Sequence, residues 1–412
     1  MAVYDVQFTD VERGIRDQFR RYMENELKPL VDQLESQEIL PFPFIKKMVA
    51  DLGLAPDADW LEETGGVKSG GDSAASPDND DNDDEEMQRV IAFAGNQLTI
   101  EMSRVSPGLC SSWGVSVGLC AGNIRRYGTP EQIKKYVPSL LRGDKIGCWC
   151  LTEPGAGSDA FGSMRTTVKK TGDCYILNGS KTFITNGPYG EVFLVYAKDA
   201  DSGAIQAYIV ENEWEGVSTG EPFRKMGMKS SPTGEVFFDD VKVPADSLLG
   251  LGVKDRDHVR KSLAGERLGI ATMSYALAEK AFEIALEYAK TREQGGQPIA
   301  NYQLVQERLA RMYVDISNSR RIVYSKQRTS SVIDACAAKL YVAEVGSRVT
   351  QQAIHILGGY GYLAEYEVER LARDAKLLEL GGGTTEIQIL TIARHLLDEN
   401  VGAQTFEAHR VG

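Results

Sequence analysis

The spacing of apolar residues divides the chain into a helical first part, a strand-rich middle part and a helical last part. Near the N-terminus, Thr9-Asp10-Val11-Glu12 has the pattern of a capping box, and apolar residues follow it at helical spacing as far as Tyr22. A second helix start is Thr129-Pro130-Glu131-Gln132, in which threonine is the cap and proline takes the first helical position. Both patterns predict helices ahead of residue 147.

Between about residue 147 and residue 250 the pattern changes to short runs that are typical of strands. Three such runs are 192–196, 207–210 and 236–238, and Pro244 closes the segment. The stretch from Arg165 to Gly179 is rich in threonine, valine and tyrosine and contains an Asn178-Gly179 dipeptide. This composition predicts a β-hairpin whose turn is Asn-Gly.

The last part returns to helical periodicity. Two stripes of apolar residues run from Leu268 to Ala289, so this helix is expected to be buried on two sides. Similar patterns fill 303–328 and 332–357. The α, β, α order predicts an α+β fold: an N-terminal helical domain (1–146), a central β-barrel-like domain (147–253) and a C-terminal four-helix bundle (254–412).

An acidic insertion interrupts the first helical part at 57–86. It contains glycines, serines and a run of acids and asparagines from Asp78 to Glu86, which cannot bury apolar surface. We therefore expect a disordered or solvated loop, with helices resuming near Met87. The alternative is a calcium loop, but the run lacks the central glycine that such a loop requires.

Composition narrows the class of partner. The 412 residues carry a net charge of −13, which argues against nucleic acid or an anionic membrane. No apolar run approaches the ~20 residues of a membrane span, and the start of the chain has neither signal-peptide nor transit-peptide character. The six cysteines show no zinc spacing and the four histidines are scattered, so we expect buried free thiols, no metal and a reduced, cytoplasmic protein.

The segment from Cys148 to Asp159 is the strongest candidate for a ligand site. It reads Cys-Trp-Cys-Leu-Thr-Glu-Pro-Gly-Ala-Gly-Ser-Asp, a mixture of hydroxyls, glycines and an aromatic that suits a polar, planar ligand. Gly155, Gly157 and Ala160 also spell G-x-G-x-x-A, the phosphate fingerprint of a dinucleotide fold. That fingerprint needs a strand before it and a helix after it, whereas here Pro154 interrupts the approach and strand-like text follows.

Six further motifs follow in a fixed order, and the whole set resembles the acyl-CoA dehydrogenase family. They are Gly179–Asn186, Asp239–Pro244, Tyr288–Gln294, Gly358–Tyr362, Arg373–Ala375 and Gly383–Gln388. The resemblance implies an FAD flavoprotein of carboxylic acid catabolism that oxidises an acyl-CoA thioester to the 2-enoyl-CoA. It also implies a homotetramer that passes electrons to an electron-transferring flavoprotein.

The resemblance assigns cofactor contacts position by position. Trp149, Leu151, Thr152 and Ser158 correspond to contacts with flavin or the start of the pantetheine arm, and Phe183 and Thr185 to residues flanking the flavin ring. Thr384 and Glu386 correspond to a further FAD contact, while Arg292, Gln303, His355 and Gly359 correspond to the grip on a neighbouring subunit's FAD. Without the surrounding motifs, Trp149 and Phe183 would be interpreted as ordinary core aromatics.

The catalytic base departs from the commonest pattern of the family. A base must take the α-proton while hydride leaves the β-carbon for flavin N5, and in many members that base is a glutamate where this chain has Gly382. The isovaleryl-CoA and long-chain type instead places its glutamate before an arginine on the first long C-terminal helix, and Glu266-Arg267 matches that arrangement. Glu266 is therefore the expected base. The alternatives are an inactive protein, or a first-turn glutamate paired with Arg267.

The resemblance also implies how the substrate is held. The Gly382 N–H would donate to the thioester oxygen together with a flavin ribityl hydroxyl, and Ser158, Arg267 and Gly382 form the expected substrate contacts. A base on the helix suits branched, aryl-substituted or otherwise bulky acyl groups, for example isovaleryl-like or benzylsuccinyl-like ones. Cys110, at the position of a carboxylate-binding arginine in glutaryl-type enzymes, counts against glutarate.

Two departures touch the shared cofactor grip. The chain has Gly295-Gly296 where the family usually has Phe-Gly, and His355 where it usually has glutamine. Two other functions stay open: an acyl-CoA oxidase and, because the usual base is replaced by Gly382, a catalytically silent flavoprotein or assembly protein.

Overall fold

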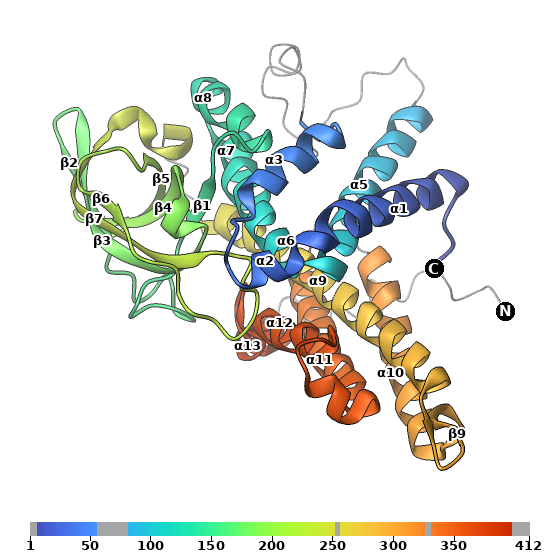
Figure 1. Ribbon diagram of the computed structural model, residues 1–412. Helices are drawn as coiled ribbons and strands as arrows, with labels where there is room; N and C mark the ends of the chain where they lie inside the picture. The colour runs from blue at the N-terminus through green and yellow to red at the C-terminus, as the bar shows by residue number, and fades with distance from the viewer. Residues whose placement is uncertain (1–5, 56–80, 252–255, 326–330, 398–412) are drawn as a thin grey trace.

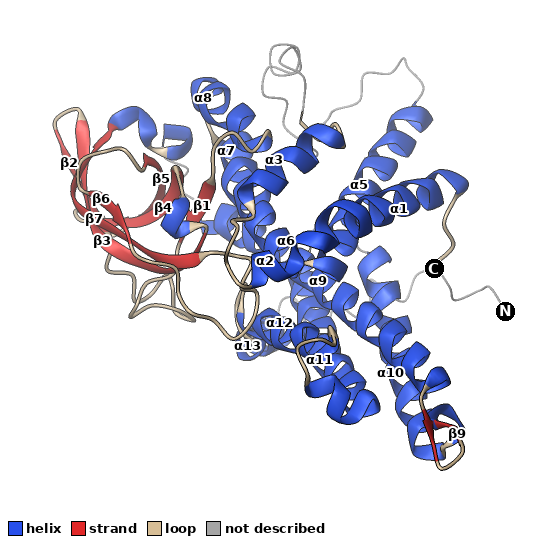
Figure 2. Ribbon diagram, in the orientation of Figure 1, coloured by secondary structure: helices blue, strands red, loops and turns tan. Residues whose placement is uncertain are grey.

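The computed structural model describes residues 6–55, 81–251, 256–325 and 331–397. A curled β-sheet lies to one side of two sets of helices, and the elements follow one another as α, β, α along the chain (Figures 1 and 2). The predicted α+β class is therefore confirmed. We propose domain boundaries at 146/147 and 253/254, next to the start of the first strand and ahead of the long helix that follows the sheet.

The described residues of the N-terminal part form helices joined by short loops. It contains α1 (Asp10–Tyr22), a π-helical turn (Met23–Leu27), a 3-10 turn (Lys28–Leu30), α2 (Val31–Glu35), α3 (Phe42–Asp51), α5 (Asp81–Val105), α6 (Pro107–Trp113), a second π-helical stretch (Gly114–Ala121), α7 (Gly122–Tyr127) and α8 (Pro130–Leu141). Both predicted capping boxes are present, at Thr9 and at Thr129. At Thr9 the hydroxyl accepts the Glu12 N–H at 3.2 Å, and the Glu12 carboxylate accepts the Thr9 N–H at 2.8 Å.

The acidic insertion is shorter than expected at its C-terminal end. Helix α5 begins at Asp81, so the residues from Asp81 to Glu86 are helical rather than part of a loop. Acidic side chains in a first turn are compatible with a helix because they face the positive end of its dipole. Residues 57–80 of the predicted loop lie outside the described residues, whereas Asp81 to Glu86, most of the run considered for calcium, belong to α5.

The central part is a mixed sheet. Its strands are β1 (Gly147–Cys150), β2 (Thr167–Thr171), β3 (Cys174–Thr185), β4 (Val192–Asp199), β5 (Ile205–Glu211), β6 (Val217–Thr219) and β7 (Thr233–Pro244). They pair in the order β1-β4-β2-β3-β7-β6, with β5 on β4; β4 runs parallel to β1 and β2, and the other pairs are antiparallel. The three runs expected as strands are confirmed in β4, β5 and β7.

Strand β4 is buried on both faces, which explains its continuous apolar sequence. Val192, Leu194 and Tyr196 join a core shared with α7 and α8, whereas Phe193 and Val195 join the core inside the curled sheet. This alternation attaches the sheet to the N-terminal helices.

The predicted hairpin exists, but its turn is not Asn178-Gly179. The turn lies between β2 and β3, next to Gly172, while Asn178 and Gly179 sit inside β3 at a register shift against β7. Asn178 is held there because its side chain exchanges two 2.9 Å hydrogen bonds with Asp240. Gly179 has φ +145°, and an added Cβ would approach Thr166 to 2.5–2.8 Å. The Asn-Gly pair therefore forms a β-bulge, and position 179 of that bulge accepts only glycine.

The C-terminal part is helical again. It contains α9 (Arg256–Thr291), a small hairpin of β8 (Glu293–Gln294) and β9 (Gln297–Pro298), α10 (Gln303–Ser325), α11 (Val332–Leu357), a 3-10 stretch (Gly358–Tyr362), α12 (Val368–Leu380) and α13 (Thr385–Leu397). The 36-residue α9 packs against α5, α10, α11 and α12, and its buried positions confirm the two predicted stripes. One core joins the N-terminal and C-terminal helices.

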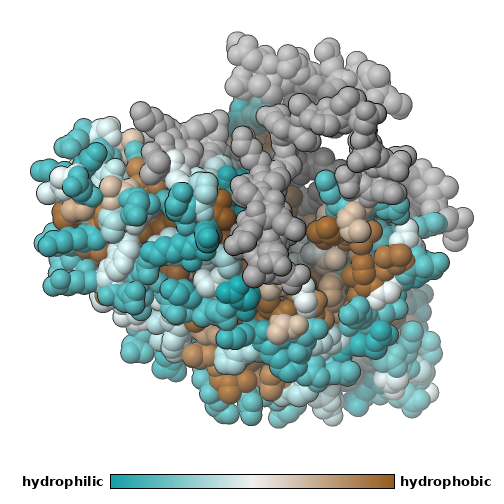
Figure 3. Space-filling view, turned by 90° about the horizontal axis from the view of Figure 1, so that it is seen from above, coloured by the Kyte–Doolittle hydropathy of each residue, from teal (hydrophilic) through white to brown (hydrophobic). Residues whose placement is uncertain are grey.

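The surface carries separate apolar patches. On the face shown in Figure 3, brown side chains lie in groups divided by hydrophilic ones. Among the described helices, none combines the length and the apolarity needed to cross a bilayer.

Candidate active site

Two of the sequence motifs are joined by a buried ion pair. The Lys181 ammonium on β3 donates to the Glu153 carboxylate at 2.8 Å and to the Leu151 carbonyl at 3.0 Å, and neither Lys181 nor Glu153 is more than 5% exposed. The Thr182 N–H donates to the Thr152 carbonyl at 2.9 Å. The loop after β1 is thereby fixed against β3, next to Phe183.

The Glu153 carboxylate also organises its own loop. It accepts the N–H groups of Arg165 and Thr166 at 2.6 and 2.9 Å. Burial by itself raises the pKa of this carboxyl, but Lys181 and these N–H donors outweigh burial and hold the pKa below its usual value. The Glu153 carboxylate is therefore an ionised structural group whose charge is balanced by Lys181.

The dinucleotide alternative is excluded by the same loop. Glu153 and Ala156 form an isolated bridge, and the residues from Gly155 to Gly162 are turns that lead into β2 rather than a helix. No helix opens on the glycines, so the phosphate-binding geometry of a dinucleotide fold is missing here.

The residues expected at the flavin ring fall into two groups. Phe183 lies on the surface, with 69% of it exposed at φ +56°, and its ring is 5.7 Å from that of Phe223. Thr152 and Thr185 are half-buried, Ser158 is exposed and Leu151 is buried. Phe183 thus presents an exposed aromatic face, and the backbone of Thr152 is hydrogen-bonded to that of its neighbour Thr182.

Trp149 is different because it belongs to the core of the sheet. Its indole packs edge-on against Tyr196 at 5.5 Å, and its Nε1–H donates to the Tyr196 hydroxyl at 3.3 Å. Trp149 is half-buried, so these contacts are compatible with a core aromatic, and its contact with flavin stays a prediction.

The two positions that compete for the role of base meet in space. Glu266 lies on α9 and Gly382 in the turn between α12 and α13, and a Cβ added to Gly382 would lie 3.4 Å from the Glu266 carboxyl carbon. The same Cβ would lie 2.4 Å from Ile270 Cδ1, and Gly382 has φ +61°. A side chain at 382 and the Glu266 carboxylate would therefore compete for one space.

Glu266 has the electrostatic character of a base tuned by burial. Its side chain is half-buried, yet its Oε2 atom is buried and has no hydrogen-bond partner among the residues that the structure describes. Burial raises the pKa of Glu266 to about 7, while the positive charges of Arg267 and Lys339 act against that rise. A carboxyl with a pKa near neutrality is half ionised at physiological pH, as general-base catalysis requires. Arg267 itself is buried, and its Nε atom has no hydrogen-bond partner within the described part of the chain.

A concave region lies at the C-terminal end of α9, away from Glu266. It is a cavity of about 420 Å³ lined by Tyr288, Arg292, Gln294, Ile299, Ile356, Leu357, Gly358, Gly359, Tyr360 and Leu363. The Arg292 guanidinium lies over the Tyr360 ring, 5.4 Å from its centre. The cavity thus brings together Arg292 and Gly359 of the expected cofactor grip.

Gly295, which stands where the family usually has phenylalanine, lies next to Gln294 of this cavity, and its surroundings leave no room for a side chain. A Cβ added to Gly295 would lie 2.5 Å from the Tyr302 hydroxyl, which donates to the Gln294 carbonyl at 2.7 Å. The Tyr302 ring therefore fills the space in which a side chain at 295 would begin.

The remaining expected contacts are spread over the surface. His355 and Gln303 are exposed and do not line the cavity around Arg292. Thr384 accepts the Ile387 N–H at 3.4 Å at the start of α13, and Glu386 is exposed in the first turn of that helix. The contacts expected of these residues would be made with a cofactor, and the described structure does not bring the residues together in one cavity.

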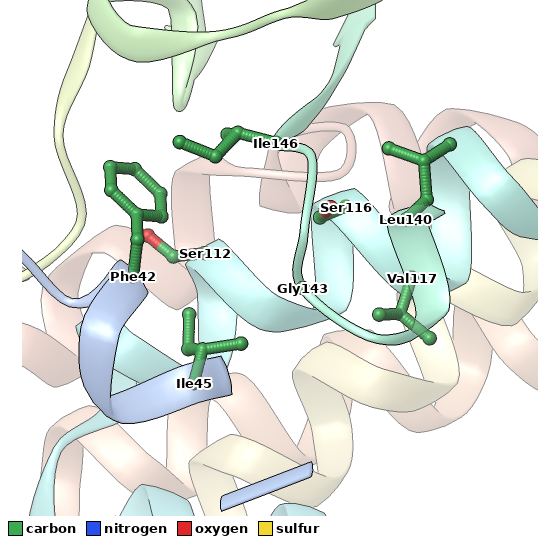
Figure 4. A pocket seen from close by; sticks show the side chains of 8 residues that line it. All are labelled: Phe42, Ile45, Ser112, Ser116, Val117, Leu140, Gly143 and Ile146. Atoms are coloured by element: carbon green, nitrogen blue, oxygen red, sulfur yellow. The ribbon is translucent and has the colours of Figure 1, made fainter. Parts of the chain in front are cut away.

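A small cavity between the N-terminal helices is not a candidate. Phe42 and Ile45 of α3 face Ser112, Ser116 and Leu140 across it (Figure 4). Its volume is about 10 Å³, which is room for about one water molecule.

Three polar residues around these sites were not found from the sequence. Lys181 and Gln388 stand inside recognised motifs, but their roles depend on partners elsewhere in the chain. Lys339 is 0% exposed on α11 and lies near Glu266. Its signal was available, since it is a lone lysine among Ala335, Ala338 and Val342 on a buried helical stripe.

Comparisons with known proteins agree with this architecture along the whole chain. Family models described as acyl-CoA dehydrogenase N-terminal, middle and C-terminal domains match residues 92–144, 148–241 and 257–397. The chain is 35% identical over 401 residues to a short-chain specific acyl-CoA dehydrogenase of Clostridium acetobutylicum, covering 94% of this chain and 98% of the relative. It is 39% identical over 307 residues to the mitochondrial isovaleryl-CoA dehydrogenase of Oryza sativa subsp. japonica, covering 73% and 75%.

A solved structure gives the same result. An acyl-CoA dehydrogenase of Bacillus anthracis, determined in complex with FAD, superposes with a TM-score of 0.83 at 30% identity, covering 97% of this chain and 69% of that one. The resemblance seen in the sequence motifs is thus confirmed. The chain belongs to the acyl-CoA dehydrogenase family, whose members are oxidoreductases acting on CH–CH bonds.

Proposed function

We propose that this protein is an FAD-dependent acyl-CoA dehydrogenase in which Glu266 is the catalytic base. The observation that carries the proposal is the convergence of Glu266 and Gly382, since the place of a side chain at 382 is 3.4 Å from the Glu266 carboxyl carbon. The glutamate missing from the turn is thereby replaced, in the same space, by one from α9.

The residues present fit FAD at two places. On β3, the exposed Phe183 ring offers an apolar face for a flat ring system, and we expect Thr152, Thr185 and Ser158 to contact the same cofactor. At the other end of α9, Arg292 stands in the cavity of about 420 Å³, where a guanidinium suits a pyrophosphate. We propose that the two places serve the FAD molecules of different subunits.

Glu266 and Gly382 divide the work on the thioester. The Glu266 carboxylate takes the α-proton, and the Gly382 N–H, which makes no hydrogen bond within the described residues, donates to the thioester oxygen as negative charge develops. The partial burial of Glu266 strengthens both interactions, because charges attract more strongly away from water. When bound, FAD supplies the acceptor for the β-hydride.

The position of the base supports branched, aryl-substituted or otherwise bulky acyl groups as the substrate class. A base that projects from α9 approaches the α-carbon from the side of the helix rather than from the α12–α13 turn.

We propose a homotetramer that passes electrons to an electron-transferring flavoprotein. Several large apolar side chains are exposed on C-terminal elements: Leu304, Tyr313, Val314, Tyr362, Leu380, Ile389, Leu390 and Leu397. Exposed apolar surface of this kind is typical of contacts between subunits.

Anaerobic mixing with a panel of branched, aryl and straight-chain acyl-CoA thioesters tests the function. We expect flavin bleaching with the wild type, loss of bleaching with retained FAD and ligand binding in Glu266→Gln, and wild-type bleaching in the control Glu287→Gln, an exposed glutamate on the same helix. Undiminished bleaching by Glu266→Gln would remove Glu266 from the mechanism.

Two other outcomes identify the alternative functions. Absence of bleaching by the wild type with every thioester would favour a silent flavoprotein. Rapid reoxidation of the bleached enzyme by oxygen would favour an oxidase.

A further inference from the structure

Lys339 is a lysine with no exposed surface next to the proposed base. It lies on α11, is 0% exposed, and both of its hydrogen bonds go to backbone carbonyls, to Gly383 O at 2.5 Å and to Glu379 O at 3.0 Å. Burying an ammonium group is costly unless its charge and its donors are used. The two carbonyls accept from two of its three donors, but as neutral groups they do not account for a full positive charge at this place.

The carbonyls that Lys339 binds belong to the turn that carries Gly382. Glu379 is in the last turn of α12, where carbonyls lack helical partners, and Gly383 follows Gly382 directly. Gln388 on α13 completes the arrangement, because its Nε2 donates to Gly383 O at 2.8 Å and to Gly382 O at 3.3 Å. With these carbonyls turned toward Lys339 and Gln388, the backbone of Gly382 is fixed beside Glu266.

The charge of Lys339 acts on the same carboxyl. Glu266 and Arg267 face it from α9, Cys336 from its own helix, Glu379 from α12 and Glu386 from α13. Burial lowers the pKa of Lys339 to about 8, and the Glu266 charge opposes that fall. Lys339 and Arg267 are the two cations that counter the effect of burial on Glu266.

We propose that Lys339 is a positioning residue for the reaction: its ammonium group holds the Gly381–Gly383 turn against Glu266, and its charge keeps that carboxyl able to ionise. The inference rests on the proposed role of Glu266 as base. A purely structural role, as a cap on the end of α12, would fix the turn without any influence on the ionisation of Glu266.

The test compares two variants of the FAD-loaded full chain. Lys339→Met removes both the charge and the donors, whereas Lys339→Gln removes the charge and keeps a donor for the carbonyls. The measurements are the pH dependence of flavin reduction by an acyl-CoA that bleaches the wild type, its dissociation constant, and carboxyl titration by ¹³C NMR in substrate-free protein with labelled glutamate. The spectrum of Glu266→Gln assigns the Glu266 signal.

We expect both variants to raise the midpoint of the pH profile and of the Glu266 titration by about one pH unit, the usual effect of losing a nearby opposite charge. The reduction rate at pH 7 then falls about fivefold, because a smaller fraction of the carboxyl is ionised. We expect Lys339→Gln to bind acyl-CoA like the wild type, since the turn keeps a donor. The control is Lys376→Met, which removes an exposed cation paired with the Glu379 side chain at 2.7 Å and should leave both midpoints in place.

If the pH profile and the Glu266 titration of Lys339→Gln have the same midpoints as the wild type, the proposal is overturned. This outcome is decisive even if Lys339→Met fails to fold. A shift of equal size in Lys376→Met would overturn it as well, because any nearby cation would then suffice. Failure of the proposed function is distinguishable: if Glu266→Gln still reduces flavin, Glu266 is not the base, while the titration of substrate-free protein still reports whether Lys339 acts on Glu266.

Discussion

Replacing the proposed base should stabilise the substrate-free protein at neutral and alkaline pH. Glu266 is partly buried, one of its oxygens has no partner, and burial raises its pKa to about 7 from 4.5. A folded protein that disfavours the ionised carboxylate loses stability as the pH rises from the unfolded pKa through the folded one. Glu266→Gln keeps the shape of the side chain without the charge, and should therefore remove this loss.

The size of the effect follows from the shift in pKa. One pH unit corresponds to about 1.4 kcal/mol, so the rise from 4.5 to about 7 corresponds to at most about 3 kcal/mol. Solvent reaching the half-buried side chain screens part of this, so we expect a gain of about 1–3 kcal/mol at pH 8. Near pH 4.5 the carboxyl is largely protonated in the folded state, and the variant and the wild type should be close in stability.

The assay is urea unfolding of wild type and Glu266→Gln between pH 4.5 and pH 8.5, with equal FAD loading. The stability difference should grow through this range and level off above pH 7. Glu287→Gln, on the exposed side of the same helix, is the control and should show no such growth. A difference between Glu266→Gln and wild type that is independent of pH would refute the reasoning, because the stability effect would then come from packing rather than from ionisation.

Three further substitutions probe the site. Gly382→Ala should destabilise the protein by about 1–2 kcal/mol, because its φ is +61° and the new Cβ would lie 2.4 Å from Ile270 Cδ1; thermal unfolding measures this, and adding Ile270→Val should recover part of the loss. Lys181→Met should lower the free energy of unfolding by urea by about 3 kcal/mol, because it leaves Glu153 buried without its cation. A loss smaller than that caused by replacing an exposed lysine with methionine would contradict this. Arg292→Met should weaken FAD retention about tenfold or more in dialysis, with acyl-CoA-dependent bleaching of the remaining flavin unchanged.

Local signals in the sequence predicted the ends of elements well. The capping boxes at Thr9 and Thr129 were correct because a cap depends on residues within one helical turn. The composition of the acidic run predicts a loop as far as Glu86, although α5 begins at Asp81, since composition alone does not distinguish an acidic first turn from a loop.

Errors arose where a distant residue decided the local structure. Asn178-Gly179 has turn chemistry, but Asp240 and Thr166 fix it as a bulge inside β3. The arrangement of the site likewise depends on residues that are far apart in the sequence. The pairing of Glu266 with an empty Gly382 was expected from two separate motifs, whereas the burial of Lys339 against the turn required the packing of α11 onto α12 and α13.

The length of α9 has a consequence for how subunits depend on one another. Glu266 lies in its N-terminal half and Arg292 follows its last residue, 26 positions later, which is about 39 Å along a helix. One rigid helix thus separates the proposed base from the proposed pyrophosphate grip by more than a single cofactor is expected to span. Chains that carry only Glu266→Gln and chains that carry only Arg292→Met should then complement each other when assembled together, because one of the shared sites in such a mixed dimer receives both intact groups.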